Sequence, residues 1–327
     1  MRVLVAGATG VVGRALVPLL AGCGHEVVGM SRSRPDDRDA TGPVGPGTVT
    51  RVAVDALDRD AVARAVDAAA PDAVVHLLTA IPDPIDPRHL DRDLGPTNRL
   101  RTEGTANLLD AARRSGVRRV VTQSVAFAYE PDADVPADVP ADEDTGLWRR
   151  PPRPFAPALR ALEELERRTA DARGLVLRLG HLYGPGTTFA PDGATVAQVR
   201  ARRFPVVGRG SAVFSFLHAH DAAGAVVAAL DRDVTGALNV VDDDPTPVAT
   251  WLPVLADVLG APPPGRVPTL AARLVAGSWG VAFLTRLRGA DNARARLQLD
   301  WRPRYASWHD GFVAELGTGR TAARETR

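Results

Sequence analysis

The first thirteen residues, MRVLVAGATGVVG, constrain the fold of this chain more than any other stretch. The apolar run at residues 3–6 is typical of a strand buried on both faces, and residues 14–20 continue with helical spacing. Gly7, Gly10 and Gly13 stand between the two. A strand, a glycine turn and a helix in this order predict a mononucleotide-binding corner, with a pyrophosphate at the helix N-terminus. The alternative is a tight turn in an α/β protein that binds nothing.

The composition excludes several other classes of protein. Acidic and basic residues nearly cancel, at 39 against 40, so no overall field favours nucleic acid or a membrane surface. The single cysteine, Cys23, excludes an internal disulfide and a cysteine-built metal site, and no other metal-ligand spacing stands out. Three glycines and Arg14 interrupt the N-terminal apolar run, which argues against a signal peptide. We therefore expect a soluble cytoplasmic protein that binds neither nucleic acid, membrane nor metal.

The spacing GxxGxxG resembles the extended short-chain dehydrogenase/reductase family, and the resemblance continues to about residue 313. It implies an α/β fold: a Rossmann-type doubly wound parallel sheet with a smaller, mostly helical C-terminal substrate domain. It also implies an NADP-binding domain at residues 1–184 with a return segment at 213–242. Residues 185–212 and 243–327 would then form the substrate-binding domain.

The end of the second expected strand carries Ser31, Arg32 and Arg34 and no acidic residue before Asp36. An arginine at this position suits a ribose 2′-phosphate, whereas an acidic residue would bind the 2′-hydroxyl of NAD. NADP(H) is therefore expected as cofactor in preference to NAD(H), the alternative being a solvated basic loop. The motif and the family resemblance together give the cofactor-binding set, which is Gly7, Thr9, Gly10, Val11, Val12, Gly13, Ser31, Arg32, Asp55, Ala56, Leu77, Leu78 and Thr79.

The chain contains no lysine, so a Tyr–Lys catalytic pair is excluded. In the family's YxxxK motif, aligned on Glu163, the tyrosine and lysine positions are taken by Phe155 and Leu159. Neither side chain can donate a proton to a carbonyl oxygen, and neither can lower the pKa of another side chain that donates one. Arg101 stands where the family usually has a proton-relay asparagine.

Two residues are candidates for the catalytic role. Ser124 resembles the family's catalytic serine at the end of the fifth strand, although a register one residue later would place Val125 there. His181 follows the sixth strand, where the family often has asparagine, and a histidine pKa near working pH would suit proton donation. The alternatives are a strand-end serine and a histidine hydrogen-bonded to the backbone.

Three functions remain open on this sequence. The first is a reductase of a hydroxyaryl ketone, because the chain resembles atypical ketoreductases of aromatic polyketide biosynthesis of the angucyclinone type, in antibiotic production. Its substrate would itself stabilise the alkoxide. The others are a non-redox epimerase, isomerase or dehydratase, and a silent NADP-binding regulator. The substrate residues would be Phe155, Leu159, Tyr183, Phe189, Phe214 and Trp279, with residues 130–153 as a lid or a simple excursion. No oligomeric state follows from the sequence.

Overall fold

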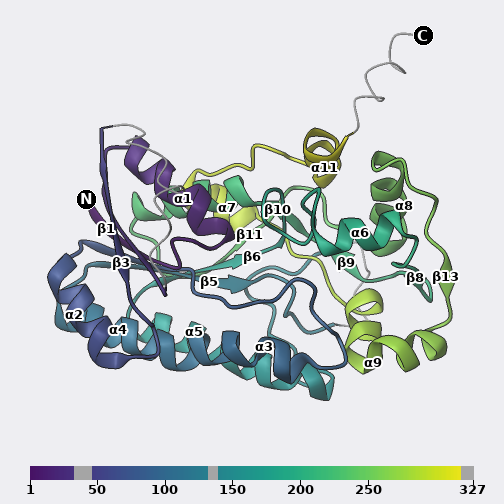
Figure 1. Cartoon of the computed structure of the whole chain (residues 1–327), viewed down its shortest axis with the longest axis horizontal. Coiled ribbons are helices and arrows are strands. Elements are labelled where there is room, and N and C mark those ends of the chain that lie inside the picture. The colour runs from purple at the N-terminus through teal and green to yellow at the C-terminus, as the bar shows by residue number, and fades with distance from the viewer. Residues whose placement is uncertain (33–45, 132–138, 318–327) are drawn as a thin grey trace, which may run out of the picture.

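The computed structural model describes residues 1–32, 46–131 and 139–317. Within these residues, no helix is long and apolar enough to cross a membrane. The fold is dominated by one sheet with helices on both faces, and a second group of helices and short strands lies at one end of it (Figure 1).

The central sheet has seven parallel strands in the order β11-β6-β5-β4-β1-β2-β3. They are β1 (Arg2–Ala6), β2 (Glu26–Ser31), β3 (Thr48–Ala53), β4 (Ala73–His76), β5 (Arg119–Val125), β6 (Leu175–Leu179) and β11 (Gly236–Val240). The chain winds outward from β1 through β2 and β3, then crosses to β4 on the other side of β1. This reversal is the switch point of a doubly wound sheet, which confirms the predicted fold class.

Helices cover both faces of the sheet because its strands are apolar on both sides. Helices α1 (Val11–Gly22) and α7 (Ala219–Leu230) pack together on one face. The other face carries α2 (Arg59–Ala69), α4 (Thr105–Arg114) and α5 (Ala156–Asp171) (Figure 1). Helix α5 turns Leu159, Leu162 and Leu165 toward the interior, as expected from residues three apart on a helix.

The helix that contains Arg101 is a long one. It begins as α3 (Leu90–Arg99), passes through one π-helical stretch, η2 (Leu100–Gly104), and continues as α4. The stretch η2 packs against α5. Single π turns of this kind are frequent at functional sites.

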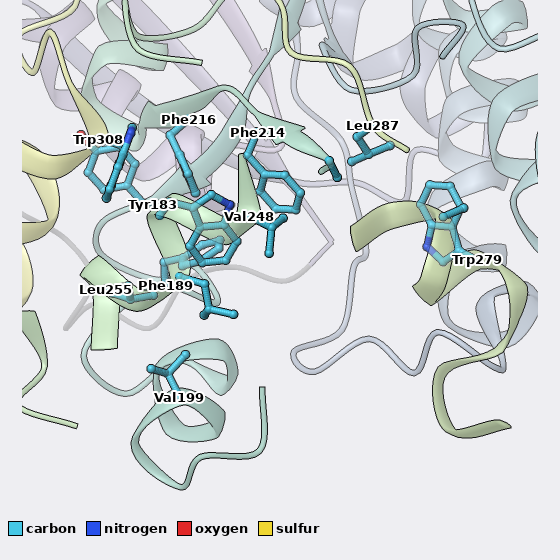
Figure 2. Packing of buried hydrophobic residues seen from close by; sticks show 14 of the residues in the cluster. Tyr183, Phe189, Val199, Phe214, Phe216, Val248, Leu255, Trp279, Leu287 and Trp308 are labelled. Atoms are coloured by element: carbon cyan, nitrogen blue, oxygen red, sulfur yellow. The ribbon is translucent and has the colours of Figure 1, made fainter. Parts of the chain in front are cut away.

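The second group of elements encloses its own apolar cluster, shown in Figure 2. It consists of β7 (His181–Tyr183), α6 (Ala194–Arg200), β8 (Val206–Val207), β9 (Val213–Phe214), β10 (Phe216–His218), β12 (Thr246–Pro247), α8 (Val248–Val258), β13 (Arg266–Val267), α9 (Thr269–Thr285) and α11 (Trp308–Leu316). The short helix η3 (Arg153–Phe155) leads into α5. Helix α10 (Ala293–Leu299) packs near β11. Helix α9, expected at 270–287, is kinked at Gly277, whose φ is 68°.

The described part of loop 130–153 is fastened to the edge of the sheet. Glu143 accepts a hydrogen bond from the backbone N–H of Asn239 at 2.7 Å, and the backbone N–H of Ala141 donates to Gly289 at 2.7 Å. These contacts cover edge strand β11, which would otherwise expose unpaired backbone groups. Residues 132–138 lie outside the described residues, and a lid role for this loop stays a prediction.

Helix α1 approaches β1 so closely that Gly13 has no room for a side chain: a Cβ there would lie 2.2 Å from the carbonyl oxygen of Gly7. We therefore expect Gly13→Ala to lower the free energy of unfolding by about 1–3 kcal/mol, measured by urea denaturation. A Cβ on Gly22, in the same helix, would meet nothing within 4 Å. Gly22→Ala should leave stability unchanged or raise it by up to about 1 kcal/mol. Equal effects of the two substitutions would contradict this packing.

Candidate functional site

The glycine turn between β1 and α1 has the geometry that the sequence predicts. Gly7 has a φ of 94°, and its N–H donates to Met30 at 2.9 Å. A Cβ on Gly7 would also lie 2.7 Å from the carbonyl oxygen of Leu77, which follows β4. The turn is thus held between the ends of β2 and β4, the two neighbours of β1.

The N-terminus of α1 is open to a ligand. Gly10 is its N-cap and provides no side-chain hydrogen bond, so the first N–H groups of the helix have no capping partner in the described structure. Thr9 is exposed, Val11 is half-buried and Val12 is buried. Uncapped N–H groups at the positive end of a helix fit the phosphates of a nucleotide.

The other predicted cofactor residues follow the carboxyl ends of neighbouring strands, so the fold brings them to one edge of the sheet. Ser31 is buried at the end of β2, and Arg32 is exposed. Asp55 follows β3 and accepts from the N–H of Leu57 at 3.0 Å. Arg34 lies outside the described residues.

Four further members of the predicted set lie on the same edge. Ala56 is buried, and its carbonyl accepts from Asn107 at 3.0 Å. After β4, Leu77 donates its N–H to Ala6 at 2.8 Å, Leu78 donates to His76 at 3.2 Å, and Thr79 is exposed.

Ser124 belongs to a buried polar network rather than to an open site. Its hydroxyl donates to Glu166 at 2.6 Å, and the same carboxylate pairs with Arg178 at 2.7 Å. Arg178 also donates to the hydroxyl of Tyr129 at 2.9 Å, and Tyr129 donates to Asn239 at 2.6 Å. The network ties β5, α5, β6 and β11 together, and a catalytic role for Ser124 stays a prediction. Val125, the alternative, is half-buried at the end of β5.

His181 is held between aromatic rings. The ring of Phe214 stacks on it at 3.9 Å and 9°, and that of Phe127 lies on it at 4.9 Å, with Phe283 edge-on at 5.6 Å. Its Nδ1 donates to the carbonyl of Ser215 at 3.2 Å, because a carbonyl can only accept. Its Nε2 is buried and has no hydrogen-bond partner in the described residues.

The expectation that His181 titrates near working pH is wrong. Burial lowers its pKa to about 3, against a smaller opposing effect of the hydrogen bond to Ser215. The imidazole is therefore neutral under ordinary conditions, and a catalytic role for His181 stays a prediction. Its Nε2 can accept a hydrogen bond from a ligand but has no hydrogen to donate.

The six predicted substrate residues are all buried in one apolar cluster, in which Phe214 and Phe189 share Phe216 and Trp251 as neighbours. Phe155 and Trp279 stack at 3.9 Å and 13°, Leu159 lies one turn further along α5, and Trp279 leads through Phe283 to His181 and Phe214. Figure 2 shows Trp279 lying apart from the rings around Phe214.

Tyr183 and Phe189 lie elsewhere in the cluster. Both pack against Phe312, with ring centroids at 5.1 and 5.7 Å, and Phe189 also meets Trp251 edge-on. Their rings complete the packing among β7, α8 and α11 and do not contact His181 directly. A binding role for these two residues stays a prediction.

Sequence reasoning missed His76, which connects the segment after β4 with α4 through two hydrogen bonds. A histidine within the aliphatic strand β4 was a usable signal. Its Nδ1 accepts from Leu78, its Nε2 donates to Thr105 at 2.8 Å, and burial and the nearby charge of Arg101 lower its pKa to about 4. Arg101, marked in the sequence only as a replaced asparagine, is itself 7 % exposed. Among the described residues, no group of three or more metal-ligand side chains lies together.

Comparison with known proteins identifies a family and a relative that matches over the full length. The model of the NAD dependent epimerase/dehydratase family matches residues 3–240. The chain is 47% identical over 325 residues to a Streptomyces protein named 3-diazoavenalumate denitrifying reductase, and the match covers 96% of this chain and 100% of that one.

Solved structures agree with the fold. UDP-glucose 4-epimerase of Thermus thermophilus in complex with NAD matches with a TM-score of 0.72 and 23% identity, over 97% of this chain and 98% of that chain. A human epimerase family protein with NADPH matches with a TM-score of 0.69 and 22% identity, over 97% and 99%.

Because the folded pKa of His181 lies below the ordinary value of about 6.5, the unfolded chain binds the proton first as the pH falls. The stability that neutral His181 contributes is thus complete above pH 6.5 and is lost as the pH falls toward 3. Between pH 7 and pH 5, the free energy of unfolding of the wild type, measured by urea denaturation, should fall by about 2 kcal/mol more than that of His181→Phe. Phe189→Leu keeps the imidazole and the rings that contact it, because Phe189 packs against Phe216, Trp251 and Phe312 instead, and should keep the wild-type pH dependence. Parallel curves for wild type and His181→Phe would contradict a buried neutral imidazole.

Proposed function

The chain belongs to the NAD dependent epimerase/dehydratase family and is an enzyme, and we propose that it is a reductase that uses NADPH to place a hydride on an electron-poor group of an aromatic substrate. The Rossmann-type sheet, the open N-terminus of α1 and the full-length match to a protein named a reductase support this.

The residues present fit a dinucleotide. Gly7 and Gly13 let the turn and α1 pack closely against the backbone, which places the uncapped end of α1 at the end of β1. The ends of β2, β3 and β4 provide the rest of a binding edge. Arg32 after β2 is the residue that would favour the 2′-phosphate of NADP over NAD. When bound, NADPH would supply the hydride. The division into a cofactor domain at 1–184 with 213–242 and a substrate domain formed by the remainder is part of this proposal.

The observation that carries the proposal is that, among the residues that the structure describes, no acidic side chain contacts His181. Its own imidazole is neutral, and its neighbours are phenylalanines. The hydroxyl hydrogen of Ser124 is directed to Glu166, and the Tyr and Lys positions of the family motif fall on Phe155 and Leu159. A reaction that needs no proton from the protein suits such a site best.

Reductive loss of dinitrogen is such a reaction, and the named activity of the Streptomyces relative points to it. The carbon of an aryl diazonium accepts a hydride, the C–N bond breaks, and its electron pair leaves with N₂, so the positive charge and the hydride cancel. No alkoxide forms and no proton is needed. A neutral His181, stacked between Phe127 and Phe214, would not repel a cationic group.

The second candidate is reduction of a hydroxyaryl ketone of the angucyclinone type, as in the ketoreductase of the simocyclinone pathway that the sequence resembles. The stacked pair of Phe155 and Trp279 favours a flat substrate for this reaction as well. In this case the phenol of the substrate would hydrogen-bond to the developing alkoxide, because the protein offers no acid for that purpose.

We expect purified protein to oxidise NADPH in the presence of a hydroxyaryl diazonium salt, with one N₂ released per NADPH, followed by absorbance at 340 nm and by gas analysis. With NADPH carrying deuterium at C4, the product should carry deuterium at the carbon that lost nitrogen. In D₂O with ordinary NADPH, that carbon should carry none. A rate equal to that without protein would contradict the proposal.

A hydroxyaryl ketone serves as the competing substrate in the same assay, with deuterium expected at the carbinol carbon. Ser124→Ala and His181→Gln should each lower kcat by less than about tenfold on the preferred substrate, because neither supplies the proton. A loss of about a thousandfold from either change would assign that residue a direct chemical role and contradict the mechanism.

For the cofactor, we expect Arg32→Asp to raise the Kd of NADPH about 10- to 100-fold and to leave that of NADH within about threefold, measured by nicotinamide fluorescence. The reason is the loss of a charge-assisted contact with the 2′-phosphate and the gain of a carboxylate suited to the free 2′-hydroxyl. Equal weakening for both cofactors would remove Arg32 from the 2′-phosphate site.

A further inference from the structure

Arg101 is a buried cation without an anion. It is 7 % exposed, and no carboxylate of the described residues pairs with its guanidinium. Burial alone lowers its pKa to about 10, with no acidic neighbour opposing that effect, so the group keeps its charge at neutral pH. An uncompensated buried charge costs several kcal/mol, which a protein rarely retains without use.

Three acidic residues along the same continuous helix, Asp93, Glu103 and Asp110, are already paired, and Asp91 is exposed at its start. Glu103 accepts hydrogen bonds from two guanidinium nitrogens of the exposed Arg99, both at 2.9 Å. Asp93 pairs with Arg92 at 2.6 Å. Asp110 lies 3.7 Å from Arg59. His76, whose charge interaction with Arg101 shows that it is near, is neutral and has both ring nitrogens engaged. Within residues 1–32, 46–131 and 139–317, no carboxylate therefore neutralises Arg101.

Arg101 lies near the carboxyl ends of the central strands, the edge of the sheet where the predicted cofactor residues lie. Its neighbour His76 ends β4 and pairs with Ala6, the last residue of β1 before the glycine turn. The crevice between β1 and β4 is the switch point, where doubly wound sheets bind their ligands. Arg101 itself stands in the π-helical stretch η2, which packs against α5, the helix of Leu159.

A second polar group points to the same use. The side-chain oxygen of Asn98, one turn before Arg101, is buried and has no hydrogen-bond partner in the described residues. Residues three apart share one side of a helix. A ligand bearing an anionic oxygen group and a nearby hydroxyl would satisfy both.

We propose that Arg101 binds an anionic oxygen group, a phosphate of the cofactor or a carboxylate of the substrate, that enters the crevice between β1 and β4. The inference rests on the proposed function only for the identity of the ligand. Arg101 is a binding and positioning residue in this view, and the free protein bears the cost of its unpaired charge until the ligand arrives.

The test compares Arg101→Met, which keeps length and apolar contacts, with Arg99→Met, an exposed arginine two residues away. The probes are NADPH, by fluorescence titration, and cinnamate against methyl cinnamate, by calorimetry in the presence of NADP⁺. We expect Arg101→Met to weaken one of the two anionic probes about 10- to 100-fold and Arg99→Met to change neither more than about twofold. The thermal midpoint of ligand-free Arg101→Met should equal or exceed that of wild type, because an unpaired charge has been removed.

The results of the two titrations distinguish a cofactor phosphate from a substrate carboxylate. Weaker NADPH binding with cinnamate unchanged assigns the phosphate, whereas weaker cinnamate binding with methyl cinnamate unchanged assigns the carboxylate. Unchanged binding of both probes together with a lower thermal midpoint would make Arg101 structural and overturn the inference. A wild-type protein that binds no NADPH would contradict the proposed function instead, and the cinnamate titration would still test Arg101.

Discussion

The approach of α1 to the end of β1 is the contact on which the rest of the ligand edge depends. Gly13 lies against the carbonyl of Gly7, and Gly7 in turn lies against Leu77, so neither position tolerates a side chain. This contact places the open N-terminus of α1 directly over the strand at the switch point. The parallel register of β1 with β2 and β4 then brings Ser31 and Leu77 to either side of the same turn. Binding groups from distant parts of the chain meet because the strands end together.

The electrostatics of the site follow from what surrounds each ionisable group. His181 lies among phenylalanine rings and loses its ability to hold a proton, whereas Ser124 lies beside a paired carboxylate and directs its hydrogen there. Both residues were expected to manage protons, and for both that role stays a prediction. A hydride acceptor that releases a neutral leaving group is compatible with such a site, because no charge on oxygen has to be neutralised.

Much of the fold and of the ligand edge could be predicted from the sequence, because those features depend on local patterns. The apolar strand runs, the glycine turn and the helical spacing around Leu159 need no distant partner to be recognised. The pKa of His181 could not be predicted, since Phe127, Phe214 and Phe283 come from three separate segments. The π-helical stretch at Arg101 was equally hidden, because one extra residue in a helical turn leaves no mark on the apolar periodicity.

The aromatic rings around His181 and the buried cation Arg101 favour different charges, and this limits which ligands can bind. The rings around His181 make its surroundings apolar, which would suit the proposed diazonium because water would otherwise attack it. Arg101 lies on the side of β4 and α5, where it favours an anion. A substrate or cofactor–substrate pair with separated charges would be oriented by both, with its cationic end at the rings and its anionic end at Arg101. Orientation of this kind suits hydride transfer, because the rate then depends on alignment of the reacting carbon rather than on acid catalysis.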